Sequence, residues 1–388
     1  MPRVVDVNDT TAPRSSPSRA PRTSDVTVVG AGIIGLAHAY LAVRRGLSVT
    51  IVEARAGVVG ASIRNFGHVC LTGQTGEFLD LARTGREHWL SAASAAGFWA
   101  AESGAFALAR TPAELAVLEE AAAEAADGLI DLVDPARIHR EIGADAPVVG
   151  GAHLPRDLRV NPREAAPRLL DWLSAQPGVE VLLSTRVLAV ESGRVRTTRG
   201  EITSGHVFVC TGHELGGILP ATADAAELRE CALSMARVRL PAEFTTAAAV
   251  LTGTSLLRYD RFAQQPAAAA LRAELESARP ELFEIVANVM CAPLPDGTLL
   301  VGDSHEYAAA APPFLSERTS RILLDGIAEA LGVPGLEVLE RWQGIYASSA
   351  VRPLIVEPVC AGVTAVTVAT GLGMTLAFGL AAADLAAL

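Results

Sequence analysis

The residues that most directly imply a chemistry are a glycine-rich turn and an acid that follows it. Gly30, Gly32 and Gly35 stand in the order G-x-G-x-x-G, directly after the apolar run 25–29. Gly30 permits a tight turn, Gly32 lets a pyrophosphate approach the backbone, and Gly35 lets a helix pack on a strand. The helix start supplies N–H donors for phosphate, and Glu53 can accept hydrogen bonds from ribose hydroxyls. Because a carboxylate repels a 2′-phosphate, the pattern predicts a dinucleotide site that does not take NADP.

A second block, residues 60–68 (G-A-S-I-R-N-F-G-H), mixes small, polar and glycine residues. The sequence contains neither a second dinucleotide motif nor a redox cysteine pair, which argues against a pyridine-nucleotide disulfide reductase. The block resembles the second flavin motif of the D-amino-acid oxidase superfamily, which contains glycine and sarcosine oxidases. This resemblance implies FAD, bound without a covalent link, with the segment running along the pyrophosphate and under the isoalloxazine ring.

Three further segments resemble motifs of the same superfamily and occur in the expected order. Residues 185–187 (T-R-V) resemble the strand whose backbone meets the adenine. Residues 209–212 (V-C-T-G) resemble the A-[TA]-G turn, with cysteine in place of alanine, and residues 370–375 (T-G-L-G-M-T) resemble the closing flavin motif. The resemblance spans residues 25–388. The positions expected to contact FAD are Gly30, Ala31, Gly32, Ile33, Ile34, Gly35, Glu53, Ala54, Arg55, Ser62, Arg64, Asn65, Phe66, Gly67, Val187, Thr211, Gly212, Gly371, Gly373, Met374 and Thr375.

The runs S-I-R-N-F-G (62–67) and G-D-S-H-E-Y (302–307) resemble a narrower branch associated with aminophosphonate breakdown. This implies a substrate with an amine at one end and a phosphonate or carboxylate at the other, aminoethylphosphonate-like and either N-methylated or not. Arg352 and Pro353 resemble the R-P element whose arginine pairs with the substrate carboxylate, and a guanidinium suits either anion. The sequence after Pro353 departs from the family pattern, so a structural arginine in an ion pair is the alternative.

Three other side chains are candidates for positioning the substrate, namely His305, Tyr307 and Tyr259. His305 is expected either to bind an anionic group or accept a proton, or to be a satisfied structural histidine. His68 directly follows the flavin block and is expected near the ring. The sequence shows no metal-ligand cluster.

The expected reaction is hydride transfer from the carbon of a C–N bond to flavin N5, followed by hydrolysis of the imine. The small-molecule amine is then one partner, and O2 or another electron acceptor is the second. Alternatives are a glycine- or sarcosine-type oxidase or dehydrogenase, a flavin monooxygenase, and a non-catalytic FAD-binding subunit.

The pattern along the chain predicts an α/β fold. Strands at 25–29 and 48–52 flank a helix at 36–45, and strands are expected at 179–191 and 201–210. Residues 77–145 are predicted to be mostly helical, with Thr111 as an N-cap, and 228–310 mostly antiparallel strand. A Rossmann-like FAD-binding domain, with a mixed sheet around a parallel core, is expected with an inserted α+β substrate domain that has an antiparallel sheet. The expected divisions are a disordered tail 1–24, the FAD-binding domain at 25–80, 146–220 and 340–388, and the substrate-binding domain at 81–145 and 221–339.

Composition excludes several other classes of protein. The net charge of −11 over 388 residues argues against nucleic-acid binding, which needs a basic face. Five well-separated cysteines fit a reducing compartment, and we expect a cytoplasmic protein. Residues 358–383 contain no charge, yet a β-branched run, a glycine turn and a helical run favour a buried strand and helix over a membrane span. The first 24 residues lack a secretory apolar run.

Overall fold

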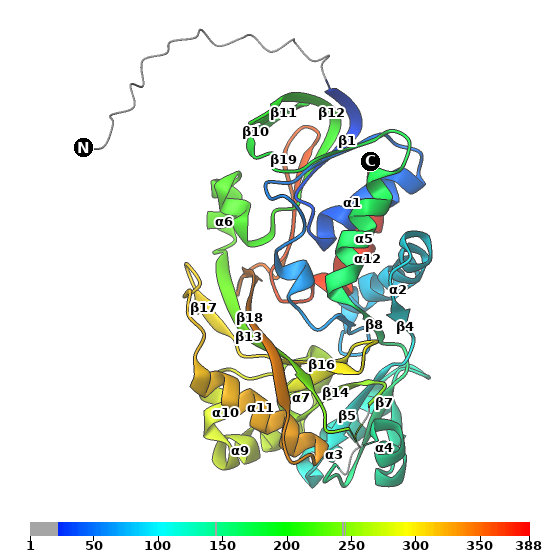
Figure 1. The fold of residues 1–388 in the computed structure, drawn as a ribbon, viewed down its shortest axis with the longest axis vertical. Coiled ribbons are helices and arrows are strands. Elements are labelled where there is room, and N and C mark those ends of the chain that lie inside the picture. The colour runs from blue at the N-terminus through cyan, green and yellow to red at the C-terminus, as the bar shows by residue number, and fades with distance from the viewer. Residues whose placement is uncertain (1–21, 144–145, 243, 245) are drawn as a thin grey trace, which may run out of the picture.

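Two large β-sheets organise the computed structural model, which describes residues 22–388 apart from 144, 145, 243 and 245 (Figure 1). The first sheet, in the upper part of Figure 1, has eight strands, and the second, in the lower part, has nine. Residues 1–21 of the expected tail lie outside the described residues. Residues 22–24 belong to the first strand, β1 (Arg22–Val29), which therefore begins earlier than predicted.

The first sheet has a parallel core, as the sequence predicts. Its central strands are short apolar runs, and strands of this kind are buried on both faces because helices cover them. The parallel strands, in spatial order, are β20 (Val363–Val368), β12 (Gly200–Val209), β1, β2 (Val49–Val52) and β9 (Val179–Leu182). Antiparallel strands extend this core and make the sheet mixed: β10 (Val187–Glu191), β11 (Arg194–Thr197) and β19 (Leu354–Cys360).

Four helices pack together beside the first sheet: α1 (Ile33–Arg44), α2 (Gly76–Ala96), α5 (Pro162–Ser174) and α12 (Gly373–Ala386). Trp89 of α2 donates a 2.8 Å hydrogen bond to the Met374 carbonyl of α12, and its ring meets Phe378 edge-on at 4.9 Å. Most of α2 thus packs with the FAD-binding half, although the predicted substrate domain begins at residue 81.

The uncharged segment 358–383 forms the end of β19, then β20, a turn and most of α12, as predicted. Within the described part of the chain, no helix has both the length and the apolar character needed to cross a membrane.

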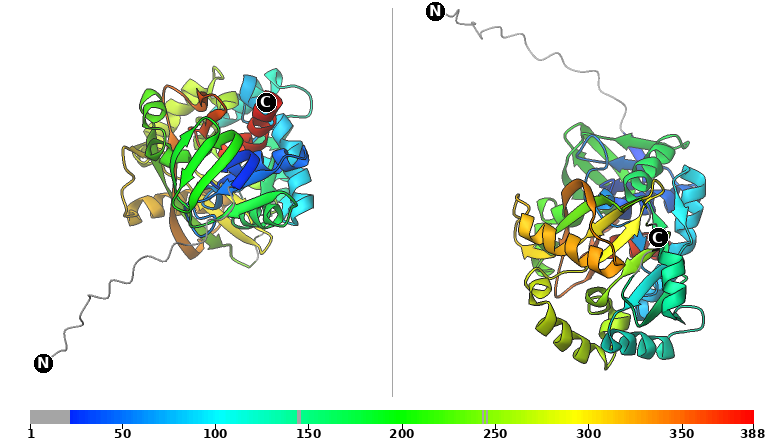
Figure 2. Two further views of the ribbon diagram at one scale, coloured as in Figure 1. Left: turned by 90° about the horizontal axis from the view of Figure 1, so that it is seen from above. Right: turned by 60° about the horizontal axis from the view of Figure 1, so that its bottom comes forward.

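The second sheet is antiparallel except where β14 (Ala249–Leu251) pairs in parallel with β5 (Ala105–Ala109). Strand β13 (Arg229–Arg239) is buried along most of its length, because alternate side chains enter two different apolar clusters. Helix α11 (Glu317–Leu331) lies across one face, as the right-hand view of Figure 2 shows. The remaining strands are β6 (Asp131–Val133), β7 (Gly150–Leu154), β15 (Met290–Pro293), β16 (Thr298–Gly302), β17 (Glu306–Ala308) and β18 (Glu337–Ser348).

Residues 77–145 are mostly helical, as predicted, but they also contain strands. The alanine-rich run 105–109 is a fully buried strand of the second sheet. Strand β7 also joins this second sheet, although it lies in the segment 146–220 predicted for the FAD-binding domain. The N-cap at Thr111 is confirmed by a reciprocal capping box with Glu114 at the start of α3 (Pro112–Glu124). The division into domains stays a prediction.

The smaller elements fill the connections between these layers. A three-stranded sheet consists of β3 (His68–Val69), β8 (Leu158–Val160) and β4 (Ala100–Ala101). The short helices are η1 (Ala61–Ile63), α4 (Pro135–Ile142), η2 (Gly212–Gly217), α6 (Pro220–Ala225), α7 (Gly253–Leu256), α8 (Asp260–Ala263), α9 (Ala268–Ala278) and α10 (Pro280–Glu284).

Candidate active site

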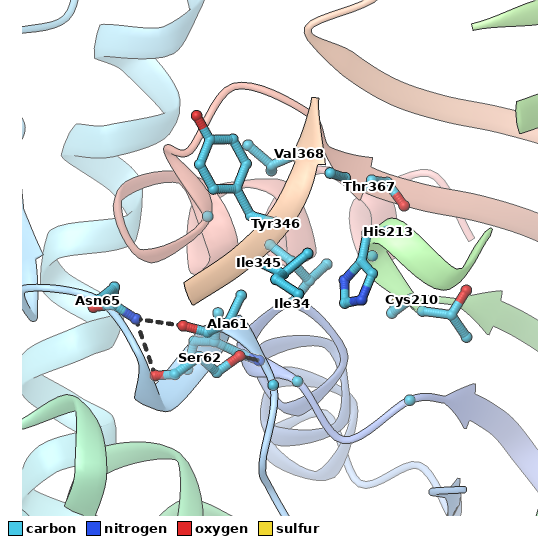
Figure 3. Close-up of a pocket in the computed structure, with 18 of the residues that line it drawn as sticks. Ile34, Ala61, Ser62, Asn65, Cys210, His213, Ile345, Tyr346, Thr367 and Val368 are labelled. Carbon is cyan, nitrogen blue, oxygen red and sulfur yellow. Dashed lines mark hydrogen bonds between the residues drawn. The ribbon is translucent and has the colours of Figure 1, made fainter. Parts of the chain in front are cut away.

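A cavity of about 870 Å³ lies where the two sheets meet. The first sheet contributes the ends of β1, β2 and β20 and the turn after β12. The second sheet contributes β13, β18 and the residues that follow β16. Figure 3 shows residues of both sheets around this space, with Tyr346 from β18 beside Val368 from β20.

The glycine turn after β1 has three distinct local environments. Gly30 has φ +103°, and a Cβ there would lie 2.6 Å from the Cys210 carbonyl oxygen. A Cβ on Gly35 would lie 2.1 Å from the Gly30 carbonyl oxygen, so the turn and α1 approach each other too closely for a side chain. A Cβ on Gly32 would meet only the Ser62 hydroxyl, at 3.4 Å. Gly32 therefore leaves the cavity wall open where a bulky group can approach the backbone.

Polar groups fix the backbone around this turn. Glu53 Oε2 accepts a 2.8 Å hydrogen bond from the Ala31 N–H, and its Oε1 accepts one from the Arg55 N–H at 2.8 Å. The Ser62 hydroxyl accepts a 2.8 Å hydrogen bond from the Ile33 N–H at the start of α1. Each carboxylate oxygen has a second lone pair, so Glu53 can still accept from a ribose hydroxyl.

The block 60–68 contains the short helix η1, and hydrogen bonds from Asn65 fix its backbone (Figure 3). The Asn65 side-chain amide donates to the carbonyls of Ala61 (2.9 Å) and Ser62 (3.1 Å), and its oxygen accepts from the Gly67 N–H. Gly67 itself does not line the cavity. A Cβ on it would lie 2.0 Å from the Val160 carbonyl oxygen, so this glycine allows β8 to pack closely.

Three buried hydroxyls at the cavity have no hydrogen-bond partner within the described chain: Thr211, Thr367 and Thr370. Buried polar atoms are almost always satisfied, so these hydroxyls indicate a polar ligand. Helix α12 begins beside them and has no side-chain cap, which leaves its first N–H groups available for negative charge.

The three free hydroxyls, the uncapped start of α12, the open backbone at Gly32 and the Glu53 carboxylate are together suited to bind FAD. Of the positions predicted to contact FAD, all line the cavity except Gly35 and Gly67: Gly30, Ala31, Gly32, Ile33, Ile34, Glu53, Ala54, Arg55, Ser62, Arg64, Asn65, Phe66, Val187, Thr211, Gly212, Gly371, Gly373, Met374 and Thr375.

A cluster of charged and aromatic side chains occupies the part of the cavity nearest the second sheet. Arg258, between α7 and α8, donates a 3.2 Å hydrogen bond to the Tyr346 hydroxyl. Burial opposes the charge of this guanidinium, but Tyr346 and Asp303 outweigh burial and raise the pKa of Arg258. Arg258 is thus a permanent cation in the cavity. Burial raises the pKa of Tyr259 and of Tyr346, so both phenols stay protonated.

Two further members of this cluster follow β16. Burial raises the pKa of Asp303 to about 6, although the Arg258 charge and the Asn288 side chain work in the opposite direction. Burial, together with the Arg258 charge, lowers the pKa of His305 to about 3. His305 Nδ1 lies 2.8 Å from the Val286 carbonyl oxygen. The imidazole is therefore neutral, and this contact assigns its proton to Nδ1.

Two of the four predicted substrate residues do not line the cavity. Arg352 forms a 2.6 Å ion pair with Glu357 on β19, so the alternative of a structural arginine holds. The acidic partner lies in the stretch where the sequence departs from the family pattern. Tyr307 is 45% exposed and stacks on His305 from outside, because β17 turns it toward solvent. The other two candidates, His305 and Tyr259, do line the cavity.

Three residues of this cluster are not predicted by any sequence pattern: Arg258, Asp303 and Tyr346. Arg258 stands in a short turn without a recognisable motif, and Tyr346 belongs to β18 of the second sheet, far from any flavin motif in the sequence. Asp303 lies within the G-D-S-H-E-Y run, which was the available signal for it.

His68, Cys70 and Asp157 also come together, which the sequence does not indicate because Asp157 is distant in the chain. The ligand-type atoms of these buried residues lie within 4.8 Å of one another. His68 Nε2 contacts Asp157 Oδ2 at 2.9 Å, and the other Asp157 oxygen accepts from the Thr72 N–H. Burial and the Asp157 charge raise the pKa of Cys70 well above its usual range, so this thiol stays protonated.

Comparisons with known proteins agree with this geometry. Residues 25–388 match the family of DAO-type FAD-dependent oxidoreductases, and the chain belongs to that family. It therefore uses FAD as its cofactor, and it is an oxidoreductase. No curated protein sequence matches the chain.

Several solved structures share the fold. Glycine oxidase from Geobacillus kaustophilus superposes with a TM-score of 0.73 at 18% identity, covering 94% of each chain. L-proline dehydrogenase from P. horikoshii gives 0.75 at 17% identity, over 93% of this chain and 92% of that one. L-α-glycerophosphate oxidase from Mycoplasma pneumoniae, with FAD bound, gives 0.72 at 18% identity, over 95% of both. These likenesses confirm the predicted fold class.

Proposed function

We propose that this enzyme oxidises the C–N bond of a small amine that also carries an anionic group, and that Arg258 binds that group. The observation that supports this most strongly is the Arg258 guanidinium in the cavity. Among the described residues it has one hydrogen bond, to Tyr346, and no carboxylate within ion-pair distance. A guanidinium can offer two parallel N–H groups to a carboxylate or a phosphonate.

The substrate that we propose first is aminophosphonate-like, with or without N-methylation. The support is the run G-D-S-H-E-Y (302–307), which resembles the branch associated with aminophosphonate breakdown. Its residues Asp303 and His305 both line the cavity close to Arg258. The second candidate is glycine or a similar simple amino acid. The support for it is the shared fold with glycine oxidase and with iminodiacetate oxidase from Chelativorans sp. BNC1, which are both named for amino acid substrates.

FAD bound in this cavity would supply an acceptor for a hydride, that is, for two electrons and a proton. Arg258 fixes the anionic end of the amine, and Tyr346 orients the guanidinium. The neutral His305 can accept an N–H hydrogen bond at Nε2. The aromatic walls of Tyr259 and Tyr346 limit the access of bulk water, which strengthens these contacts. Water then hydrolyses the imine product to a carbonyl compound and a free amine.

The test is anaerobic reduction of the purified holoenzyme, followed through the visible absorbance of oxidised FAD. The panel contains 2-aminoethylphosphonate, its N-methyl derivative, glycine, sarcosine, D-amino acids and NADPH. We expect an amine with an anionic group to reduce the FAD and the matched amine without it, such as ethylamine, to react far more slowly. Reduction by NADPH alone would favour a monooxygenase and contradict the proposal. The proposal includes O2 or another oxidant as the acceptor that reoxidises the reduced FAD. It also includes a cytoplasmic location.

A further inference from the structure

We propose that Asp303 binds the amino group of the substrate, so that Asp303 and Arg258 together form a two-ended clamp for a zwitterion. This inference rests on the proposed function, in which Arg258 holds the anionic end. It adds a second charged subsite and a reason for the enzyme to choose amines. The step is the formation of an ion pair and hydrogen bonds, with no covalent change.

The first support is the environment of the Asp303 carboxylate. Asp303 is 5% exposed and lines the cavity, and its Oδ1 has no hydrogen-bond partner in the described chain. A buried carboxylate oxygen without a partner is costly, and such a group is normally satisfied by a ligand or by ordered water. A substrate ammonium group supplies both the missing hydrogen bond and the missing opposite charge.

The second support is the rigid placement of this residue. The backbones of Asp303 and Asn288 exchange two hydrogen bonds of 2.8 Å each, which fix the start of the segment after β16. The Ser255 hydroxyl donates to Asn288 Oδ1 at 2.7 Å. The side-chain NH2 group of Asn288 can therefore donate to other acceptors. The carboxylate is thus held by its surroundings and still has a free acceptor atom.

The third support is the relation of Asp303 to Arg258. The two charges influence each other through the cavity, yet they form no ion pair within 4.0 Å in the part of the chain that the structure describes. Asp303 instead has His305 Nε2 at 3.9 Å from its Oδ2. Because this imidazole is neutral with its proton on Nδ1, it cannot neutralise Asp303. Both opposite charges therefore remain available to one ligand.

The clamp has a consequence for substrate choice. An alcohol of the same shape has no positive charge, so Asp303 would stay unpaired beside it. This matters because the same fold includes L-α-glycerophosphate oxidase. We therefore expect the cavity to prefer an amine over a neutral isostere of the same size.

The experiment measures binding to the chemically reduced holoenzyme under anaerobic conditions, where no amine can be oxidised. Isothermal titration calorimetry compares glycine with propanoate, and 2-aminoethylphosphonate with propylphosphonate. In each pair a methyl group replaces the ammonium group. For at least one pair, we expect the unaltered enzyme to bind the amino ligand about tenfold to a hundredfold more tightly than its isostere. Asp303→Asn should remove that preference, whereas Asp171→Asn, on the exposed face of α5, should keep it.

Two results would overturn the clamp. One is equal binding of both isosteres in both pairs by the unaltered enzyme, and the other is a preference that persists in Asp303→Asn. If amines reduce the FAD of the unaltered enzyme and either result appears, only the clamp fails. If no amine reduces the FAD, the proposed function itself fails.

A second measurement needs no variant. The preference for glycine over propanoate should decline as the pH falls through about 6, because Asp303 becomes protonated there. The neighbouring groups do not titrate in that range, since the pKa of His305 is lowered to about 3 and those of Arg258, Tyr259 and Tyr346 are raised. A preference that is constant from about pH 5 to about pH 8 contradicts the clamp.

Discussion

The Arg258 guanidinium donates a hydrogen bond of 3.2 Å to the Tyr346 hydroxyl, and this contact joins a short turn to strand β18 across the cavity. Neither residue stands in a flavin motif, yet both line the cavity.

Replacing Arg258 with methionine should weaken the binding of the anionic substrate. The loss of a charge-assisted hydrogen-bond pair predicts a KM about tenfold to a hundredfold higher, while FAD content stays normal. Steady-state kinetics with the best amine of the panel measures this change. The matched control is Arg352→Met, which removes the arginine that pairs with Glu357 outside the cavity. If Arg352→Met raised KM more than Arg258→Met, the sequence-based assignment would be right and the structural one wrong.

Tyr346→Phe should have a smaller effect, because the hydroxyl orients Arg258 without carrying charge. We expect KM to rise about twofold to tenfold, the range for one ordinary hydrogen bond. The double variant with Arg258→Met should show no additional effect, since the hydroxyl acts through the guanidinium. Additive effects in this double-mutant cycle would show that Tyr346 contacts the substrate independently.

Substitution by alanine should have different effects at Gly32 and at Gly35. In Gly35→Ala the new Cβ would lie 2.1 Å from a backbone oxygen, so we expect poor folding and a lower melting temperature. In Gly32→Ala the Cβ meets only the Ser62 hydroxyl at 3.4 Å, so the apoprotein should fold normally but bind FAD more weakly. Thermal unfolding of the apoproteins and FAD titration separate the two effects. Unchanged FAD affinity in Gly32→Ala would show that no cofactor group approaches the backbone there.

Asp303→Asn should stabilise the fold at neutral pH. Burial raises the folded-state pKa of Asp303 to about 6, above the usual range of an unfolded aspartate. The group therefore favours folding while protonated, and this contribution is lost as pH rises from about 4 through about 6, for a total of about 3 kcal/mol. The melting temperature of the variant should exceed that of the unaltered holoenzyme at pH 8, and the difference should vanish near pH 4. A difference that does not depend on pH would contradict the burial of this charge.

The sequence predicted the cofactor half of the site better than the substrate half, for a physical reason. Gly30, Gly32 and Glu53 belong to one local strand–turn–helix unit, so their spacing alone determines where they lie. Arg258, Asp303 and Tyr346 follow or belong to β14, β16 and β18, which are distant in the sequence and come together in the second sheet. Their proximity depends on long-range pairing such as that of β13 with β18, which no local pattern encodes.

Local ambiguity explains the other differences. Arg352 matched a motif, but Glu357 is close enough in sequence and space to pair with it. Residues 105–109 have the alanine content of a helix and become a strand because they are enclosed on both faces by apolar clusters. All five cysteines are free: Cys70, Cys210, Cys231 and Cys291 are buried, and Cys360 is exposed at the end of β19.

The most direct test of the central claim is a single-turnover product analysis. Holoenzyme is mixed anaerobically with the amine that reduces its FAD, and the carbonyl compound and the released amine are quantified against the FAD reduced. Oxidation at the C–N bond predicts one carbonyl compound and one ammonia or amine for each FAD reduced, with the anionic group intact in one of these two products. Reduction of FAD without a carbonyl product, or with the C–N bond unbroken after hydrolysis, would contradict the account.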